Sequence, residues 1–307
     1  MADSATPASG AVRQSLTEGR TLAAAMPELS IEARRITATV LAGWHGRRRA
    51  GPGETFWQFR QFVAGEPAAG IDWRRSARDD HHLFVREKEW EAAHTLWLSP
   101  DLSASMDFRS RLAPITKRER TAVLTLALAE LFAKAGERTG LLGHMAPVLS
   151  RNAAGKIAVA LTGSTEVAPH ETQMLRRHAE VILLGDFLDP IDQIEARLAA
   201  ITAAGAVSHL VQVLDPIEET FPYTGRTEFR DPESGARQLL GRAEGVRAAY
   251  QRLLAVRRDR LSAAARRRGG SFLVHRTDEP ATVPLLALYA RLGDRGDLQR
   301  AAAGRAA

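Results

Sequence analysis

The sequence predicts an α/β fold in which a largely parallel sheet is flanked by helices. From residue 93 onward, short apolar runs alternate with longer amphipathic segments, which is the pattern of βαβ units. The apolar runs are nearly continuous, as expected for strands that are buried on both faces. The chain has 307 residues, 45% of them hydrophobic and 25% charged. This length and composition suit one large α/β domain with an appendage.

The segments before the sheet have a different character. Residues 1–28 are rich in Ala, Ser, Gly and Pro without any period, which is typical of a disordered tail. A helix is expected from Ser30, a suitable N-cap, to the glycines at 43 and 46. Residues 47–92 are dense in Arg, Gly and aromatic residues, and the alternation over 83–89 predicts a strand. We therefore expect an N-terminal helix and a small β-rich module over 29–92.

The first half of the sheet domain begins with an apolar strand at 93–99. An Ala- and Leu-rich helix follows at 115–136 and is interrupted near its end by Gly136. A short strand is expected at 140–144, and a short helix at 155–161. These elements are typical of one half of an open α/β sheet.

The second half repeats the alternation up to residue 298. The most apolar strand of the chain, 181–184, ends in Gly185 and Asp186. A helix at 190–203 leads to a strand at 207–214, and a charged segment then separates that strand from a helix at 244–268. The expected domain, 93–298, closes with a strand at 272–275 and a helix at 285–292.

Composition excludes several classes of function. The chain has no cysteine, so it forms no disulfide, cysteine–zinc site or thiol nucleophile, as is common in a reducing compartment. It shows no secretory signal, and its longest uncharged run, 198–214, contains polar residues and a glycine. We therefore expect a cytoplasmic protein without a membrane span.

The net charge of +6 raises the alternative of nucleic-acid binding, because clustered cations neutralise phosphates. Arginines are spread along the whole chain, however, and the clusters at 47–49 and 266–268 lack interleaved aromatic residues for base stacking. Nucleic acid is therefore not an expected partner.

Polar side chains follow several expected strands, at the point where each strand ends. They are Asp101, His144, Asp186, Asp215 and Asp278. Ligands of open α/β sheets collect beyond the carboxyl ends of the strands. An Asp in this position often only caps the next helix, which is our interpretation of Asp215 and Asp278. Asp101 and Asp186 stand out, since the first precedes two serines and the second follows the most apolar strand.

Asp101, Ser103 and Ser105 alternate just after the apolar run Leu96–Leu98. One carboxylate and two hydroxyls offer Mg²⁺ an incomplete shell of oxygen ligands that a partner's carboxylate could complete. The plain alternative is a serine-rich turn that caps the following helix. The Asp-x-Ser-x-Ser stretch resembles the metal-dependent adhesion motif of von Willebrand factor A domains.

Residues 47–92 contain a longer set of matching positions, of which Ile-Asp-Trp-x-x-Ser-Ala-Arg is the most specific. The set comprises Gly51, Gly53, Glu54, Phe56, Arg60, Phe62, Gly65, Ile71, Asp72, Trp73, Ser76, Ala77, Arg78, Arg86, Glu87 and Glu89. Together with Asp101-x-Ser103-x-Ser105 and the strand into Asp186, it resembles the bacterial family called domain of unknown function 58, DUF58. The resemblance covers about residues 30–290.

This resemblance implies a von Willebrand A-like, Rossmann-like fold that follows a β-rich signature module. It implies that Asp101, Ser103 and Ser105 hold Mg²⁺, with Asp186 accepting hydrogen bonds from metal-bound water. A complete adhesion motif adds a Thr from a separate loop, where this chain has residues 151–155 without one. The implied site is therefore partial.

The resemblance also implies a non-catalytic adaptor that works with a MoxR-type AAA+ ATPase and presents client proteins to it. In the signature segment, Arg60, Asp72, Trp73 and Arg78 are candidate binding residues. The alternative is that Trp73 and the neighbouring phenylalanines form the core of the module, with the charged residues paired around it.

An enzyme is the competing interpretation, namely a metal-dependent hydrolase or phosphotransfer protein that uses Asp101. Phosphatases with an aspartyl intermediate need a second acid two residues on, and this chain has Ser103 there. The sequence also lacks a G-x-S-x-G elbow, a Walker A loop and a G-x-G-x-x-G turn after a strand. We therefore expect no catalysis.

Overall fold

The computed structural model describes residues 26–41, 56–63, 71–79, 82–88, 94–163 and 171–303. The chain divides into two compact units. The larger comprises Met1–Gly46 and His94–Ala307, and the smaller Arg47–Ala93. Most of the tail expected at 1–28 lies outside the described residues.

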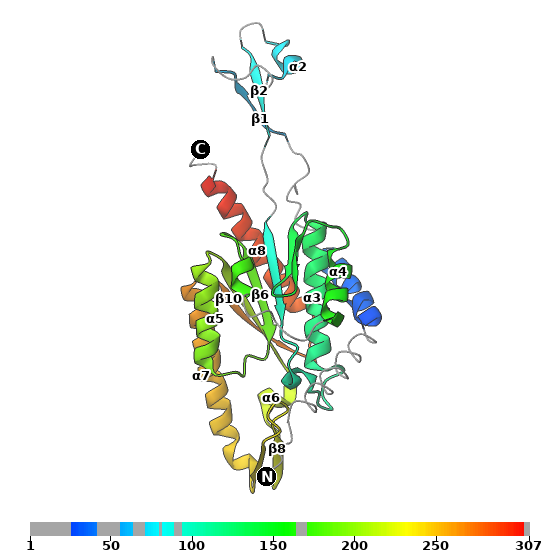
Figure 1. Cartoon of the computed structure of the whole chain (residues 1–307), viewed down its shortest axis with the longest axis vertical. Helices are drawn as coiled ribbons and strands as arrows, with labels where there is room; N and C mark the ends of the chain where they lie inside the picture. The colour runs from blue at the N-terminus through cyan, green and yellow to red at the C-terminus, as the bar shows by residue number, and fades with distance from the viewer. Residues whose placement is uncertain are drawn as a thin grey trace, which may run out of the picture. The chain divides into compact units, whose positions relative to one another are not determined.

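The larger unit is built on a six-stranded sheet with the order β10-β7-β6-β3-β4-β5 (Figure 1). Its strands are β3 (Thr95–Pro100), β4 (Arg138–Leu141), β5 (Met145–Val148), β6 (Glu180–Gly185), β7 (Val207–Leu214) and β10 (Ser271–Arg276). All neighbours pair in parallel except β5, which is antiparallel to β4. The prediction of a mostly parallel α/β sheet flanked by helices is therefore confirmed.

One face of the sheet is covered by four helices. They are the helix over residues 26–41, α3 (Lys117–Lys134), α4 (Ala153–Gly163) and α8 (Thr282–Ala303). The central helix α3 is buried nearly all round. Leu96 and Leu98 of β3 join Leu126 of α3 and Leu285 of α8 in one apolar cluster.

The opposite face is covered by α5 (Ile191–Ala203) and α7 (Arg247–Arg267). Trp97 of β3 and Val181 of β6 pack there with Leu198 of α5 and Leu261 of α7. Because successive strand residues point to opposite faces, the apolar runs serve both layers of helices.

The N-terminal helix is already formed at Met26, earlier than expected, and packs with the larger unit. Met26, Leu29 and Val40 are buried in the same cluster as α3, and Thr37 Oγ1 donates to Ala127 O at 3.2 Å. The expected division, which grouped this helix with the β-rich module, differs from the structure because the helix buries its apolar face on the sheet domain.

Short elements fill two segments, the turn after β4 and the charged segment after β7. The mix of acids, aromatics and turn residues over 213–230 was compatible with a hairpin or a docking loop. Gly143, at a φ of +79°, lies in the turn between β4 and the unexpected strand β5. The charged segment after β7 contains α6 (Pro216–Thr220) and an antiparallel hairpin of β8 (Thr227–Arg230) and β9 (Arg237–Leu240).

The smaller unit contains a two-stranded antiparallel sheet of β1 (Phe56–Gln61) and β2 (Phe84–Lys88), and the short helix α2 (Trp73–Ser76). Ser76 Oγ links α2 to the sheet, since it donates to Asp72 O at 2.9 Å and accepts from Phe84 N at 2.8 Å. The strand predicted over 83–89 is confirmed.

Candidate functional site

The candidate site lies where the sheet order changes direction, between β3 and β6. After β3 the chain adds β4 on one side, and β6 then pairs with β3 on the other side. Asp101 and Asp186 follow these two strands, and Asp101 N donates to Leu184 O at 2.7 Å. This switch point is where open α/β sheets place ligands.

The Asp101 loop carries three side chains at this point whose oxygen atoms could bind a metal ion: Asp101, Ser103 and Ser105. Asp101 Oδ1 accepts from Ser103 N at 2.9 Å, which turns the loop so that the next serines face the site. The hydroxyl oxygens of Ser103 and Ser105 are 3.1 Å apart. The spacing seen in the sequence therefore becomes one cluster.

Asp186 joins this cluster from β6. The Ser105 hydroxyl donates to Asp186 Oδ2 at 3.0 Å, and Leu188 N donates to Oδ1 at 3.1 Å. The side chain is almost completely buried, with 3% of the residue exposed. The structure thus brings together the four residues Asp101, Ser103, Ser105 and Asp186, which the sequence analysis singled out.

A buried lysine supplies the positive charge beside Asp186. Lys117 Nζ lies 2.9 Å from Asp186 Oδ2 and 2.8 Å from Glu218 Oε1. Lys117 is the first residue of α3, where the Thr116–Glu119 capping box begins the helix. Glu218 belongs to α6, and its Oε2 accepts from Asp215 N at 2.8 Å.

Burial and charge shift the pKa values of these groups in ways that matter for the site. Burial raises the pKa of Asp101, against the hydrogen bond from Ser103, and the nearby Asp186 adds to the rise. Burial alone would lower the pKa of Lys117, but Glu218 and Asp186 outweigh it, and the pKa is raised. Lys117 is therefore a cation at neutral pH, while the Asp101 carboxylate would gain from a positive ligand.

The two serine hydroxyls have the chemistry and the separation of adjacent Mg²⁺ ligands. Adjacent ligands of an octahedral Mg²⁺ at about 2.1 Å lie roughly 3 Å apart, which agrees with the separation of the two serine hydroxyls. Among the described residues, no group of three or more His, Cys, Asp or Glu side chains could hold a metal ion. A metal at this site would therefore need the serine hydroxyls as ligands beside the carboxylate.

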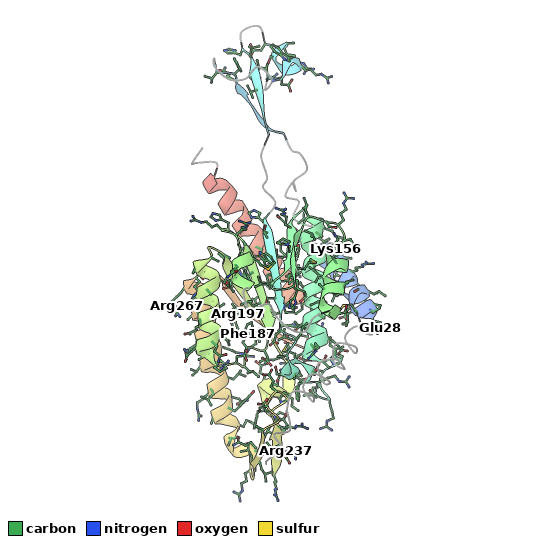
Figure 2. The ribbon with its side chains drawn as sticks, in the orientation of Figure 1. Glu28, Lys156, Phe187, Arg197, Arg237 and Arg267 are labelled. Carbon is green, nitrogen blue, oxygen red and sulfur yellow. The ribbon has the colours of Figure 1, made fainter. Side chains whose placement is uncertain are left out.

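A pocket of about 490 Å³ opens beside Asp101, on the α5 face of the sheet. It is lined by Asp101, Ser103 and Asp189 together with Arg197 of α5 and the backbone around Phe187, of which Phe187 and Arg197 are labelled in Figure 2. Arg197 Nη2 donates to Ser99 Oγ at 2.9 Å. Asp101 is therefore accessible from solvent through this pocket, whereas Asp186 and Lys117 are buried and do not line it.

The other strand-end residues have separate roles. Asp215 caps α6, since its Oδ1 accepts from Ile217 N at 2.9 Å and its Oδ2 accepts from Ser110 N at 2.8 Å. Asp278 pairs with Arg276 at 2.6 Å, and its pKa is lowered by that hydrogen bond. The capping interpretation of Asp215 is confirmed, whereas Asp278 serves as an ion-pair partner. His144 lines the pocket.

In the smaller unit, the structure places three of the four candidate binding residues on one short segment. Asp72 caps α2 by accepting from Arg75 N at 2.9 Å, Trp73 is 62% exposed, and Arg78 is exposed. The alternative in which Trp73 forms the core is therefore wrong, because most of its ring surface faces solvent. Arg60 lies in β1 opposite Val85, and its side chain lies outside the described residues.

Sequence reasoning missed Lys117 and Glu218. The available signal was rarity, because Lys117 is one of four lysines among 42 basic residues. Lys117 opens the charged first turn of α3, Lys117–Arg120, and nothing local in that turn shows that this ammonium bridges two carboxylates. The Thr expected from a complete adhesion motif is not supplied by Thr162, whose hydroxyl donates to Val159 O at 2.8 Å, and Thr165 lies outside the described residues.

The fold and site together define a mostly parallel α/β protein with an oxygen-rich site at the switch point of its sheet. The chain belongs to the DUF58 family, described as proteins of unknown function, whose sequence profile matches residues 58–261.

Related proteins extend over most of the chain. Uncharacterized proteins of Mycobacterium bovis and Mycobacterium tuberculosis are 27% identical over 285 residues, which cover 84% of this chain and 85% of each relative.

Two solved structures align with the whole of their own chains and 66% of this one, at 12% identity. They are a conserved hypothetical protein BatB of Bacteroides thetaiotaomicron, with a TM-score of 0.40, and an aerotolerance-related membrane protein of Bacteroides fragilis, with a TM-score of 0.41. Scores of this size carry no argument about this chain. Within the described residues, no helix has the length and apolar character needed to span a membrane.

Proposed function

We propose that this protein is a non-catalytic adaptor of the cytoplasm that binds partner proteins through the Asp101 site. The observation that carries the proposal is the cluster of Asp101, Ser103 and Ser105 at the switch point, of which Asp101 and Ser103 line a pocket. A carboxylate whose pKa is raised by burial and two hydroxyls 3.1 Å apart favour recognition of a cation shared with a partner.

In this proposal Mg²⁺ is bound by Asp101, Ser103 and Ser105, and a carboxylate of the partner completes the ligand shell. Bound Mg²⁺ would supply a positive charge that links the Asp101 carboxylate to a carboxylate of the partner. Asp186 would hold Ser105 in place through their 3.0 Å hydrogen bond. Lys117 neutralises Asp186 from behind, so the buried carboxylate needs no metal of its own.

The proposed partner is a MoxR-type AAA+ ATPase, to which the adaptor would present client proteins. This choice rests on the resemblance described in the sequence analysis, to a family to which the chain belongs. The exposed Trp73 and Arg78 of the smaller unit are a second candidate surface for the ATPase or its client.

Calorimetry with a MoxR-type ATPase from the same organism tests the proposal. We expect binding to weaken at least about tenfold, or ~1.4 kcal/mol, when Mg²⁺ is removed by a chelator, and equally in Asp101→Ala. Asp278→Ala is the matched control, because it removes an Asp that follows another strand of the same sheet and pairs with Arg276.

The proposal predicts that Asp278→Ala binds like the wild type. Binding that is insensitive to both the chelator and Asp101→Ala would contradict the role of the site. Turnover of a phosphoester by the wild type that is lost in Asp101→Ala would replace the adaptor with an enzyme.

A further inference from the structure

The N-terminal half of α7 extends past the end of α5 and beyond the sheet (Figure 1). One side of this half is held by the segment that follows α6. Arg247 Nε donates to Phe221 O at 2.8 Å, and the Tyr250 hydroxyl donates to Glu218 O at 2.6 Å. The rings of Phe221 and Tyr250 lie 4.7 Å apart. This part of α7 is thus anchored on one side by α6 and by the segment that follows it.

A second side of the same half carries apolar residues that are exposed. Val246 is 37% exposed, Leu253 is 70% exposed and Val256 is 57% exposed, and Ala249 between them is exposed as well. Ala249, Leu253 and Val256 lie four and three residues apart, which places them on one face of α7. Val246 ends the 3₁₀ turn that leads into the helix. We call these four residues the α7 stripe.

Contacts one turn further along the helix show where the α7 stripe points. Arg257 and Arg260 lie four residues after Leu253 and Val256, and therefore on the same face. Arg257 Nε donates to Phe187 O at 2.6 Å, and Arg260 Nη2 lies 3.3 Å from Glu195 Oε2 of α5. The stripe therefore faces the side of the molecule that holds Phe187 and the pocket beside Asp101.

A further exposed apolar side chain lies in the chain between Phe187 and Asp189, two residues that line that pocket. Leu188 is 47% exposed and is fixed by the hydrogen bond from its amide to Asp186 Oδ1. Exposed apolar groups that adjoin a polar pocket are typical of protein interaction sites.

Charge identifies the kind of partner that fits. Arg252 is exposed on α7 next to Leu253, and Arg257 uses its guanidinium on backbone carbonyls of Phe187 and Asp189. Over the described residues, neither arginine forms an ion pair with a carboxylate. Asp189 and Asp186 already act on the charge of Arg257, so Arg252 is the cation that an acidic side chain of a partner would pair with, whereas a second copy of α7 would bring a like charge to it.

We infer that the α7 stripe and Leu188 dock an amphipathic helix of a partner protein, with its apolar side on the stripe and acidic residues on its flanks. Val246 to Val256 span about 15 Å, which matches about three turns of such a helix. The inference rests on the proposed adaptor function and names the chemistry of the partner segment that would lie beside the Asp101 site.

Fluorescence anisotropy with a synthetic helical peptide tests this inference. The probe is a labelled three-heptad peptide with Leu at positions a and d and Glu at e and g, used where sedimentation shows it to be monomeric. Its counterpart has Lys in place of each Glu. We expect the Glu peptide to bind the full-length protein more tightly than the Lys peptide.

The two matched variants each place two Glu residues on α7 and therefore add the same negative charge to it. Leu253→Glu with Val256→Glu should weaken binding of the Glu peptide at least about tenfold. Ala248→Glu with Ala255→Glu, at exposed positions of α7 outside the stripe, should change it less than about threefold.

Equal losses in both variants, tighter binding of the Lys peptide, or no binding of the Glu peptide would each overturn the inference. A wild-type dimer that Leu253→Glu with Val256→Glu dissociates would also overturn it, because the stripe would then bind a second copy. Binding of the MoxR-type ATPase to the same variants distinguishes this inference from the proposed function. ATPase binding that needs Asp101 but not the stripe would refute only the inference, while peptide binding without ATPase binding would refute only the proposed function.

Discussion

Gly185 is the residue on which the geometry of the switch point depends. A Cβ at this position would lie 2.8 Å from Asp101 Cβ and 3.1 Å from Asp101 Oδ2. Contacts of this length are too short for a side chain, so β6 can approach the Asp101 loop this closely only with glycine at its end. Gly185 therefore sets how near Asp101 lies to Asp186.

Gly185→Ala should lower the free energy of unfolding by about 1–3 kcal/mol, because the added methyl group displaces Asp101 in a packed region. Urea unfolding measures this change. Gly245→Ala is the control, since nothing lies within 4 Å of a Cβ there, and its effect should stay within about 0.5 kcal/mol. Equal free energies of unfolding for the two variants would show that the Asp101 loop moves away from the added methyl group without loss of stability.

Asp101→Asn should raise the free energy of unfolding at pH 7. Burial raises the pKa of Asp101 in the folded state, so the ionised form opposes folding, while Asn is neutral and its Oδ1 still accepts from Ser103 N. The gain should shrink as the pH falls through the raised pKa toward 3.8, because the folded wild type then takes up the proton.

Urea unfolding at a series of pH values, with chelator present, measures this difference. A gain that does not change with pH would show that the charge of Asp101 is not its cause.

At the scale of elements, α3 connects the core to the site. Its capping box begins the helix at Thr116, whose hydroxyl accepts from Glu119 N at 3.0 Å and whose N–H donates to Glu119 Oε2 at 2.8 Å. The next residue is Lys117. The first turn of α3 therefore places the buried ammonium, and the rest of the helix fills the core.

Thr116→Ala should destabilise the protein by about 1 kcal/mol, because the amide at N3 loses its acceptor. Thermal or urea unfolding measures it. Thr202→Ala is the comparison, since that hydroxyl donates to Leu198 O inside α5 at 2.9 Å and caps nothing. A larger loss for Thr202→Ala than for Thr116→Ala would contradict the capping role.

Elements with a strong apolar period were predictable, and short elements with mixed composition were not. The strand at 207–214 was predicted with the bounds it has as β7, because seven of its eight residues are buried and its sequence is correspondingly apolar. The hairpin β8–β9 is largely exposed, so its sequence carries charged residues without a period. The pairing of β8 with β9 depends on contacts that a local sequence pattern does not reveal.

At the scale of the whole molecule, Lys117 joins three parts of the chain far apart in sequence. The Lys117 side chain is 1% exposed, and its ammonium bridges Asp186, which follows β6, and Glu218 of α6. Burial raises the pKa of Glu218 despite Lys117, so a protein that lost this cation would keep two poorly solvated carboxylates in one place.

Lys117→Met should destabilise the protein by about 3–5 kcal/mol, because it leaves buried carboxylates without a counter-charge. Lys134→Met is the matched control on the same helix. Its ammonium is 46% exposed and pairs with Glu130 at 3.3 Å, so we expect a loss below about 1 kcal/mol. Urea unfolding at pH 7 measures both, and similar values for both variants would contradict the bridging role.

The pH dependence of the Lys117 contribution has a definite sign. Its pKa is raised above the model-peptide value of 10.5, so its contribution to stability is complete below that value and is lost as the pH rises through the folded-state pKa. The difference between wild type and Lys117→Met should therefore shrink only in strongly alkaline solution.

Local pattern in the sequence determined the α/β class, the course of most strands and helices, and the residues Asp101, Ser103, Ser105 and Asp186. It could do so because buried strands and amphipathic helices impose periods, and because parallel strands bring their carboxyl ends to one edge. Only the tertiary structure decided that Lys117 and Glu218 complete this cluster, that Trp73 faces solvent, and that the N-terminal helix packs with the sheet domain. These features depend on residues that meet from distant parts of the chain, where burial and charge pairing, not local sequence, set the free energy.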